Sequence, residues 1–127
     1  MLRTEYVDGV IIVQLPDGIG HTNRRAFEKD MEPILDENSE VLFDMTQVTR
    51  LDSVGLGAIL GCLKRLQANG GNLKLYGTSR QIRTLLELVR MHHVLDLFNT
   101  RREALESYHI GHAILQHDHS SGCACMW

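Results

Sequence analysis

The chain has 127 residues, which suits a single domain with a substantial core, and its formal net charge is −3. The 13 Lys and Arg residues are scattered along the sequence, so the composition argues against nucleic acid as a direct partner. No apolar run approaches the roughly 18 residues of a membrane span, and the first residues lack the apolar segment of a signal peptide. We therefore expect a soluble, cytoplasmic protein.

The first part of the chain predicts two strands and a helix. The stretch EYVDGVIIVQLP alternates and then runs apolar, and Asp8-Gly9 in its middle is typical of a tight turn between antiparallel strands. From about 22 to 37, apolar residues recur at helical spacing. We expect Pro33 to kink or split that helix, because proline cannot donate the backbone hydrogen bond.

The central part alternates strands with helices. Residues 40–45, EVLFDM, predict a strand, and 46–50, TQVTR, predict a loop. A long helix is expected after Ser53, where apolar residues recur on one face until the run 69–71, Asn-Gly-Gly, ends it. The alternating stretch 72–77 then predicts another strand.

The last part predicts one more helix, a strand and a final helix. The helix begins at Ser79, the strand covers 94–98, and Thr100 with Glu103 three residues later suits the start of the final helix. The predicted order is β-β-α-β-α-β-α-β-α. Strands that alternate with helices need crossover connections, so the fold class is α/β, a mixed β-sheet with helices packed on it.

The stretch LDSVGLG at 51–57 allows three interpretations of Ser53. Its hydroxyl suits the N-cap of the helix that follows, an interaction of about 1 kcal/mol. It is also a candidate nucleophile, or a hydroxyl that another enzyme phosphorylates. A phosphate at a helix N-terminus meets free N–H groups and the positive end of the helix dipole, so the fold can accept it.

Two enzyme signatures fail in this stretch. A dinucleotide-binding fingerprint needs a third glycine where the chain has Leu60. A nucleophile elbow needs glycine two residues before Ser53, where the chain has Leu51. We therefore expect no catalytic residues and no cofactor.

The residues around Ser53 carry a family resemblance. The stretch VLFDMTQVTRLDSVGLGAILGCLKRLQANGGNLKLYG closely resembles the core of STAS domains of the anti-sigma factor antagonist (anti-anti-sigma factor) type. In that family a strand ends in Asp, a loop leads to a D-S-x-G-L-G signature, and a helix closes with a Gly pair. The resemblance implies a STAS domain at 1–110 followed by a tail at 111–127. The residues that match the signature are Asp44, Asp52, Ser53, Gly55, Leu56 and Gly57.

The resemblance implies a regulator rather than an enzyme. Such proteins, when unphosphorylated, bind an anti-sigma factor with serine/threonine kinase activity and so release a sigma factor for transcription. The kinase phosphorylates the serine that Ser53 matches and the complex dissociates; a serine phosphatase restores the binding form. Several family members carry a second serine where this chain has Val54. The implied partner-binding residues are Asp44, Thr49, Asp52, Ser53, Val54, Gly55, Leu56 and Gly57.

Thr49 is a second candidate for modification, although a structural role in its loop is the stronger interpretation. Asp44 and Asp52 are expected to shape the loop and contact the partner, and Gly55 and Gly57 to permit close approach of a partner backbone.

Two alternatives remain open. A STAS domain can act as a scaffold without phosphorylation. The C-terminal stretch from His109 onward also holds donors that suit zinc or copper, although their spacing matches no standard finger and a polar, mobile tail is the stronger interpretation. These donors are His109, His112, His117, His119, Cys123 and Cys125.

Overall fold

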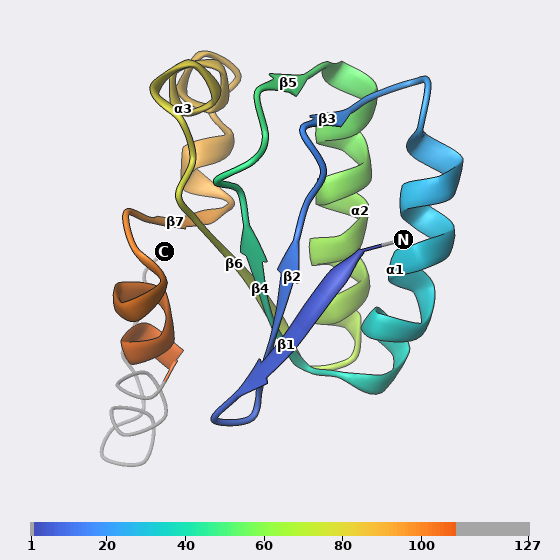
Figure 1. The fold of residues 1–127 in the computed structure, drawn as a ribbon, viewed down its shortest axis with the longest axis vertical. Helices are drawn as coiled ribbons and strands as arrows, with labels where there is room; N and C mark the ends of the chain where they lie inside the picture. Colours follow the sequence, from blue (N-terminus) through green and yellow to red (C-terminus); the bar gives the residue numbers. More distant parts are fainter. Residues whose placement is uncertain (1, 109–127) are drawn as a thin grey trace.

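The computed structural model describes residues 2–108, whose centre is one five-stranded sheet in the order β1-β2-β4-β6-β7 (Figure 1). β1 is antiparallel to β2, and the remaining neighbours are parallel, so the sheet is mixed as predicted. The five strands are Arg3–Val7, Val10–Gln14, Glu40–Asp44, Asn72–Tyr76 and Asp96–Phe98.

The turn between β1 and β2 follows from its residues. Asp8 and Gly9 both have positive φ, 52° and 84°, which is the backbone that a two-residue hairpin turn requires. β1 lies at the edge of the sheet and is mostly exposed, whereas β2 is buried along nearly its whole length. The predicted antiparallel pair is therefore confirmed.

Helices cover the two faces of the sheet unequally. α1 and α2 lie side by side on one face, while the helix at 101–108 packs on the other (Figure 1). Successive side chains along a strand point to opposite faces of the sheet, so alternate strand residues pack into the two separate cores on either side. The helical segments are Arg24–Glu37 (α1), Ser53–Ala68 (α2), Arg80–Leu88 (α3) and the 3₁₀ turn Met91–His93 (η1).

The predicted order of the main strands and helices is confirmed, and the structure adds three short elements, β3, β5 and η1. β3, Gly18–Ile19, and β5, Arg50–Leu51, form a separate parallel pair. The prediction that 46–50 is entirely loop was therefore wrong at Arg50. The strand predicted at 94–98 begins only at Asp96, because Val94 belongs to the end of the 3₁₀ turn. Two-residue strands carry too little periodicity to be read from a sequence.

The expected split of α1 at Pro33 was wrong, since the helix continues to Glu37. Phe27, Met31 and Leu35 lie on its buried face, while Pro33 is exposed. The carbonyl that proline leaves without a helical donor therefore faces water, which can replace the missing bond.

Side-chain caps are found at two helix starts: at Thr100, where a cap was predicted, and at Ser79, where only the start of a helix was predicted. The Ser79 hydroxyl accepts a hydrogen bond from the Ile82 amide at 3.2 Å, and the Thr100 hydroxyl accepts one from the Glu103 amide at 3.2 Å. Within residues 2–108, no helix has the length and apolar character needed to cross a membrane.

Candidate functional site

The start of α2 lies beside the small sheet of β3 and β5 (Figure 1). Asp52 joins β5 to α2 and has an extended backbone, and its Oδ1 accepts a hydrogen bond from the Gly55 amide at 2.9 Å. Its carbonyl accepts another from the Leu56 amide at 2.9 Å. Asp52 is therefore the N-cap, and the interpretation of Ser53 as the cap was wrong.

Ser53 is the first helical residue of α2 and is exposed. Among residues 2–108, none forms a hydrogen bond with its hydroxyl. The hydroxyl is thus presented to solvent at the end of a helix that its neighbour caps. The His21 ring, which lies 3.3 Å from the Asp52 carboxylate, forms no hydrogen bond with Ser53, so the described residues provide no base for a nucleophilic serine.

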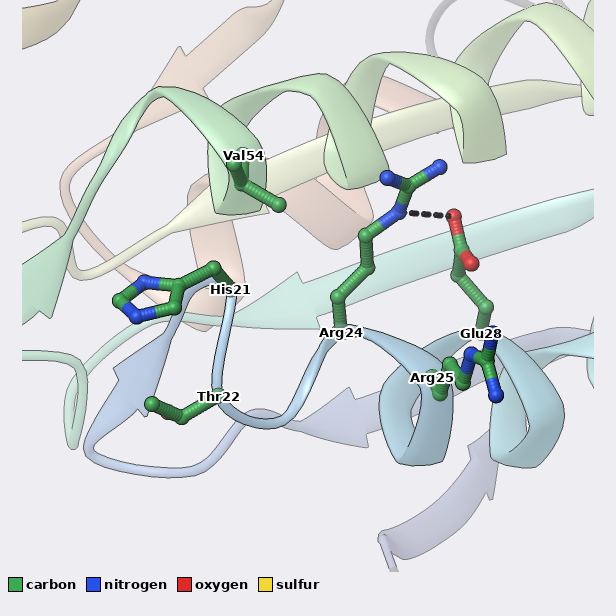
Figure 2. A pocket seen from close by; sticks show the side chains of 6 residues that line it. All are labelled: His21, Thr22, Arg24, Arg25, Glu28 and Val54. Carbon is green, nitrogen blue, oxygen red and sulfur yellow. Dashed lines mark hydrogen bonds and ion pairs between the residues drawn. The ribbon is translucent and has the colours of Figure 1, made fainter.

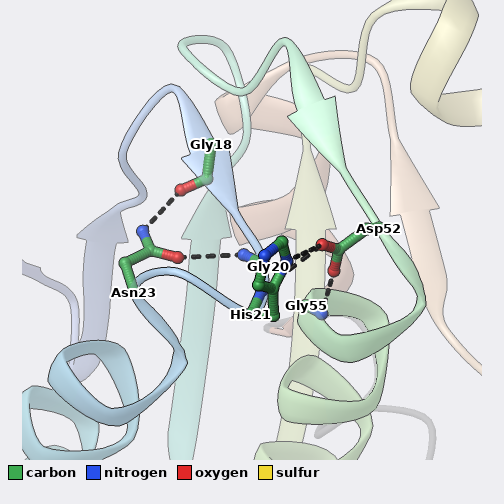
Figure 3. Close-up of polar contacts among 6 residues, drawn as sticks. All are labelled: Gly18, Gly20, His21, Asn23, Asp52 and Gly55. Atoms are coloured by element: carbon green, nitrogen blue, oxygen red, sulfur yellow. Dashed lines mark hydrogen bonds and ion pairs between the residues drawn. The ribbon is translucent and has the colours of Figure 1, made fainter.

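Asp52 also anchors the segment that leads from β3 to α1 (Figure 3). Its Oδ2 accepts from the His21 amide and lies 3.3 Å from both that nitrogen and the His21 Nδ1. A Cβ on Gly20 would lie 2.5 Å from this oxygen, so glycine allows the approach. The Asn23 side chain closes the same segment, since it donates to the Gly18 carbonyl at 2.7 Å and accepts from the Gly20 amide at 2.9 Å.

These contacts set the charge of Asp52. The Gly55 amide and, after it, the His21 side chain hold the pKa of Asp52 below its usual value. The carboxylate is therefore ionised at pH 7, directly before Ser53 in the chain. A second negative group on Ser53 would stand beside it.

The two signature glycines have different surroundings. A Cβ on Gly55 would lie 2.0 Å from the carbonyl oxygen of Ile19, so only glycine lets α2 pack on β3. Gly57 is exposed and has no atom within 4 Å of the equivalent position. The close approach that Gly55 permits is thus to this chain's own backbone. For Gly57, approach of a partner stays a prediction.

Asp44 and Thr49 hold the loop between β4 and β5. Asp44 is 9% exposed and accepts from the Thr46 amide at 2.9 Å and the Thr46 hydroxyl at 2.5 Å. Burial acts to raise its pKa, but the bonds from Thr46 and Tyr76 outweigh burial and lower it. The Thr49 amide and hydroxyl donate to the Asp17 carbonyl at 2.8 and 3.2 Å. Neither residue contacts Ser53, and the hydrogen bonds of both stabilise the β4–β5 loop.

A hollow of about 460 Å³ opens between the start of α1 and the start of α2 (Figure 2). Val54 forms its α2 wall, while Leu56 is half-buried against the core. The sequence analysis did not predict this hollow. Arg24 and Arg25 in the first turn of α1 could have indicated a functional surface, because cations at that end of a helix are disfavoured by the helix dipole. Its lining consists of His21, Thr22, Arg24, Arg25, Glu28 and Val54.

The whole arrangement matches a known family. The model of the STAS domain family fits residues 1–104. The chain belongs to the STAS domain family. A relative from Thermotoga maritima, whose name assigns it provisionally to the anti-sigma factor antagonists, is 24% identical over 108 residues, which are 84% of this chain and 96% of that protein.

Solved STAS structures share the fold. An anti-sigma factor antagonist from Mycobacterium paratuberculosis superposes with a TM-score of 0.75 at 22% identity and covers 84% of this chain and 92% of its own. The antagonist SpoIIAA in its unphosphorylated form gives 0.65 at 16% identity, covering 87% and 99%. The Bacillus SpoIIAA in the phosphorylated form gives 0.64 at 17% identity, covering 85% and 99%. The predicted fold class is confirmed.

The C-terminal predictions lie outside the described residues. They are the domain end at 110, the tail at 111–127 and the candidate metal ligands His109, His112, His117, His119, Cys123 and Cys125.

Proposed function

We propose that the chain is an anti-sigma factor antagonist controlled by phosphate on Ser53. The unphosphorylated form binds an anti-sigma factor with serine/threonine kinase activity, which frees a sigma factor for transcription. The kinase phosphorylates Ser53 and the complex dissociates, and a serine phosphatase restores the binding form. The chain acts by competitive binding and catalyses nothing itself.

The observation that carries the proposal is the exposed Ser53 hydroxyl on a helix that Asp52 already caps. Because the capping bond runs from Gly55 to Asp52, esterification of Ser53 removes no contact that holds α2. The free amides and the dipole at the start of a helix favour a phosphate at this position. The fold therefore tolerates both forms of the side chain.

The charge of the phosphate supports release of the partner. Phosphorylation adds about −1.5 to −2 charges at pH 7 beside the ionised Asp52. Like charges brought together in an interface cost several kcal/mol, and about 1.4 kcal/mol is tenfold in affinity. Release then needs no large change of shape.

The test begins with recovery of the partner. The full-length Ser53→Ala chain captures its partner from the native cell, mass spectrometry identifies it, and the partner is then purified. With Mg-ATP, this kinase should phosphorylate the wild-type chain at Ser53. It should leave Ser53→Ala unmodified and phosphorylate the Thr49→Ala variant as fully as the wild type.

Calorimetric titration then measures the switch. We expect complete phosphorylation to weaken binding by about a hundredfold or more, and Ser53→Asp to weaken it partly. Equal affinity of the two forms would make the chain a scaffold. Phosphate on Thr49 in place of Ser53 would move the switch to the β4–β5 loop.

A further inference from the structure

The hollow between α1 and α2 shares a wall with the candidate switch. Val54, the residue after Ser53, faces Arg24 across the hollow, and Arg25 and His21 complete the side formed by the α1 segment (Figure 2). Its volume of about 460 Å³ is ample for one or two side chains of another protein. Any partner that covers Ser53 also meets this opening.

The hollow carries uncompensated positive charge. Arg24 pairs with Glu28 at 3.2 Å, and both side chains are about half exposed. Arg25 is exposed and forms no ion pair with any other residue in 2–108. The chain as a whole has a net charge of −3, so the local excess of positive charge at the hollow is opposite in sign to the net charge of the protein.

The cations also lie where the helix itself disfavours them. The first turn of α1 holds Arg24 and Arg25 and no acidic residue. The side chain of Asn23, at the N-cap position, makes no capping bond because it joins Gly18 to Gly20. The positive end of α1 thus lies beside two positive side chains, of which only Arg24 has an acidic partner, Glu28. Positions that break a local rule without a compensating contact are where functional sites are expected.

We propose that this hollow receives an acidic side chain, aspartate or glutamate, from the anti-sigma partner. The proposal rests on the proposed function, because it concerns the same partner. The incoming carboxylate pairs with Arg25 and neutralises the start of α1, while the apolar stem of the side chain packs on Val54. The hollow therefore selects a partner with a negative projection beside its contact with Ser53.

The same geometry links docking to release. A phosphate on Ser53 places its charge one residue from Val54, on the rim of the hollow. It repels the carboxylate that Arg25 attracts and competes with it for the same cation. One modification thus acts twice on the partner, without movement of either helix.

The experiment titrates the purified anti-sigma kinase, recovered as above, into unphosphorylated full-length variants. Arg25→Glu should weaken binding at least tenfold. Arg102→Glu, which makes the same change of charge at an exposed residue of the helix on the opposite face, should stay within twofold of the wild type. Arg25→Gln, which only removes the charge, should fall between them and guards against misfolding of the reversed variant.

A charge swap makes the test specific. Exposed Asp and Glu residues of the kinase are changed to Arg one at a time, and one of them should restore binding to Arg25→Glu to within a few fold of the wild type. Wild-type affinity of Arg25→Glu and Arg25→Gln, or failure of every swap, would overturn the inference. In either case, phosphorylation-dependent release of the wild-type chain would leave the proposed function standing, whereas its absence would remove both.

Discussion

Polar side chains are placed differently in two regions of this molecule, the sheet face covered by helix 101–108 and the start of α2. On the face covered by helix 101–108, side chains meet inside: Lys74 Nζ lies 4.4 Å from the ring centroid of Tyr108. The Tyr108 hydroxyl donates toward the carbonyls of Val41 and Asn72 at 2.7 and 3.0 Å. At the start of α2, the Asp52 carboxylate caps the helix and Gly55 packs against the Ile19 carbonyl, while the side chain of Ser53 is exposed to solvent.

The difference shows how a fold can present a modifiable residue. Asp52 and Gly55 stabilise the start of α2. Ser53, which lies between them in the sequence, is therefore not needed to hold the helix. On the other face Tyr108 is both packed and hydrogen-bonded, so it cannot change without a cost to the fold. Substitutions at four positions, two of them with a matched control elsewhere, test this contrast between an exposed modifiable residue and the residues that support the fold.

Gly55→Ala should have the largest effect. The new methyl would meet the Ile19 carbonyl at 2.0 Å, so α2 must shift away from β3, at a cost of about 3 kcal/mol. Gly57→Ala is the matched control in the same helix. Its surroundings are open, and it should stabilise by about 0.5–1 kcal/mol. Urea unfolding compares the two, and equal midpoints would contradict the packing role of Gly55.

Tyr108→Phe should come next, with a loss of about 1–2 kcal/mol. The buried hydroxyl donates toward two carbonyls, and its removal leaves them without that donor. Tyr6→Phe changes the same group on an edge strand where the ring is 64% exposed, and should lie within about 0.5 kcal/mol of the wild type. Thermal unfolding of both variants measures this difference; a Tyr108→Phe protein as stable as Tyr6→Phe would refute the role of the bond.

Asp52 should make a smaller contribution that depends on pH. Its folded pKa lies below the usual value, so its contribution is complete above the unfolded pKa of about 3.9 and is lost as pH falls through the folded pKa. Asp52→Asn keeps a capping side chain without a titrating group and should lose less stability between pH 5 and pH 3 than the wild type. Asp52→Ala should be destabilised at every pH. Urea midpoints across this range provide the measurement, and parallel pH profiles for wild type and Asn would count against the cap.

Ser53→Ala should have the smallest effect on folding, within about 0.5 kcal/mol, because Ser53 is exposed and is not the cap. Calorimetry of the purified chain measures it. A loss comparable to that of Asp52→Ala would show that the hydroxyl does support the helix.

Local chemistry made much of the fold predictable. Asp8 and Gly9 indicated the hairpin turn, and the Asn-Gly-Gly run ended α2 as expected. The wrong predictions arose where a neighbour in space decided the outcome. Pro33 stays within α1 because it lies on the exposed face, and Arg50 becomes strand because Gly18 lies beside it.

The sequence by itself determined the order of the main elements and singled out Ser53, because turn residues, helical spacing and the signature motif are all local in the chain. Only the tertiary structure decided what surrounds that serine. His21 and Asp52 are 31 positions apart, and the hollow joins α1 to Val54 across a similar separation. Such contacts follow from how the strands bring the two helix starts together, and no periodicity within either segment encodes them.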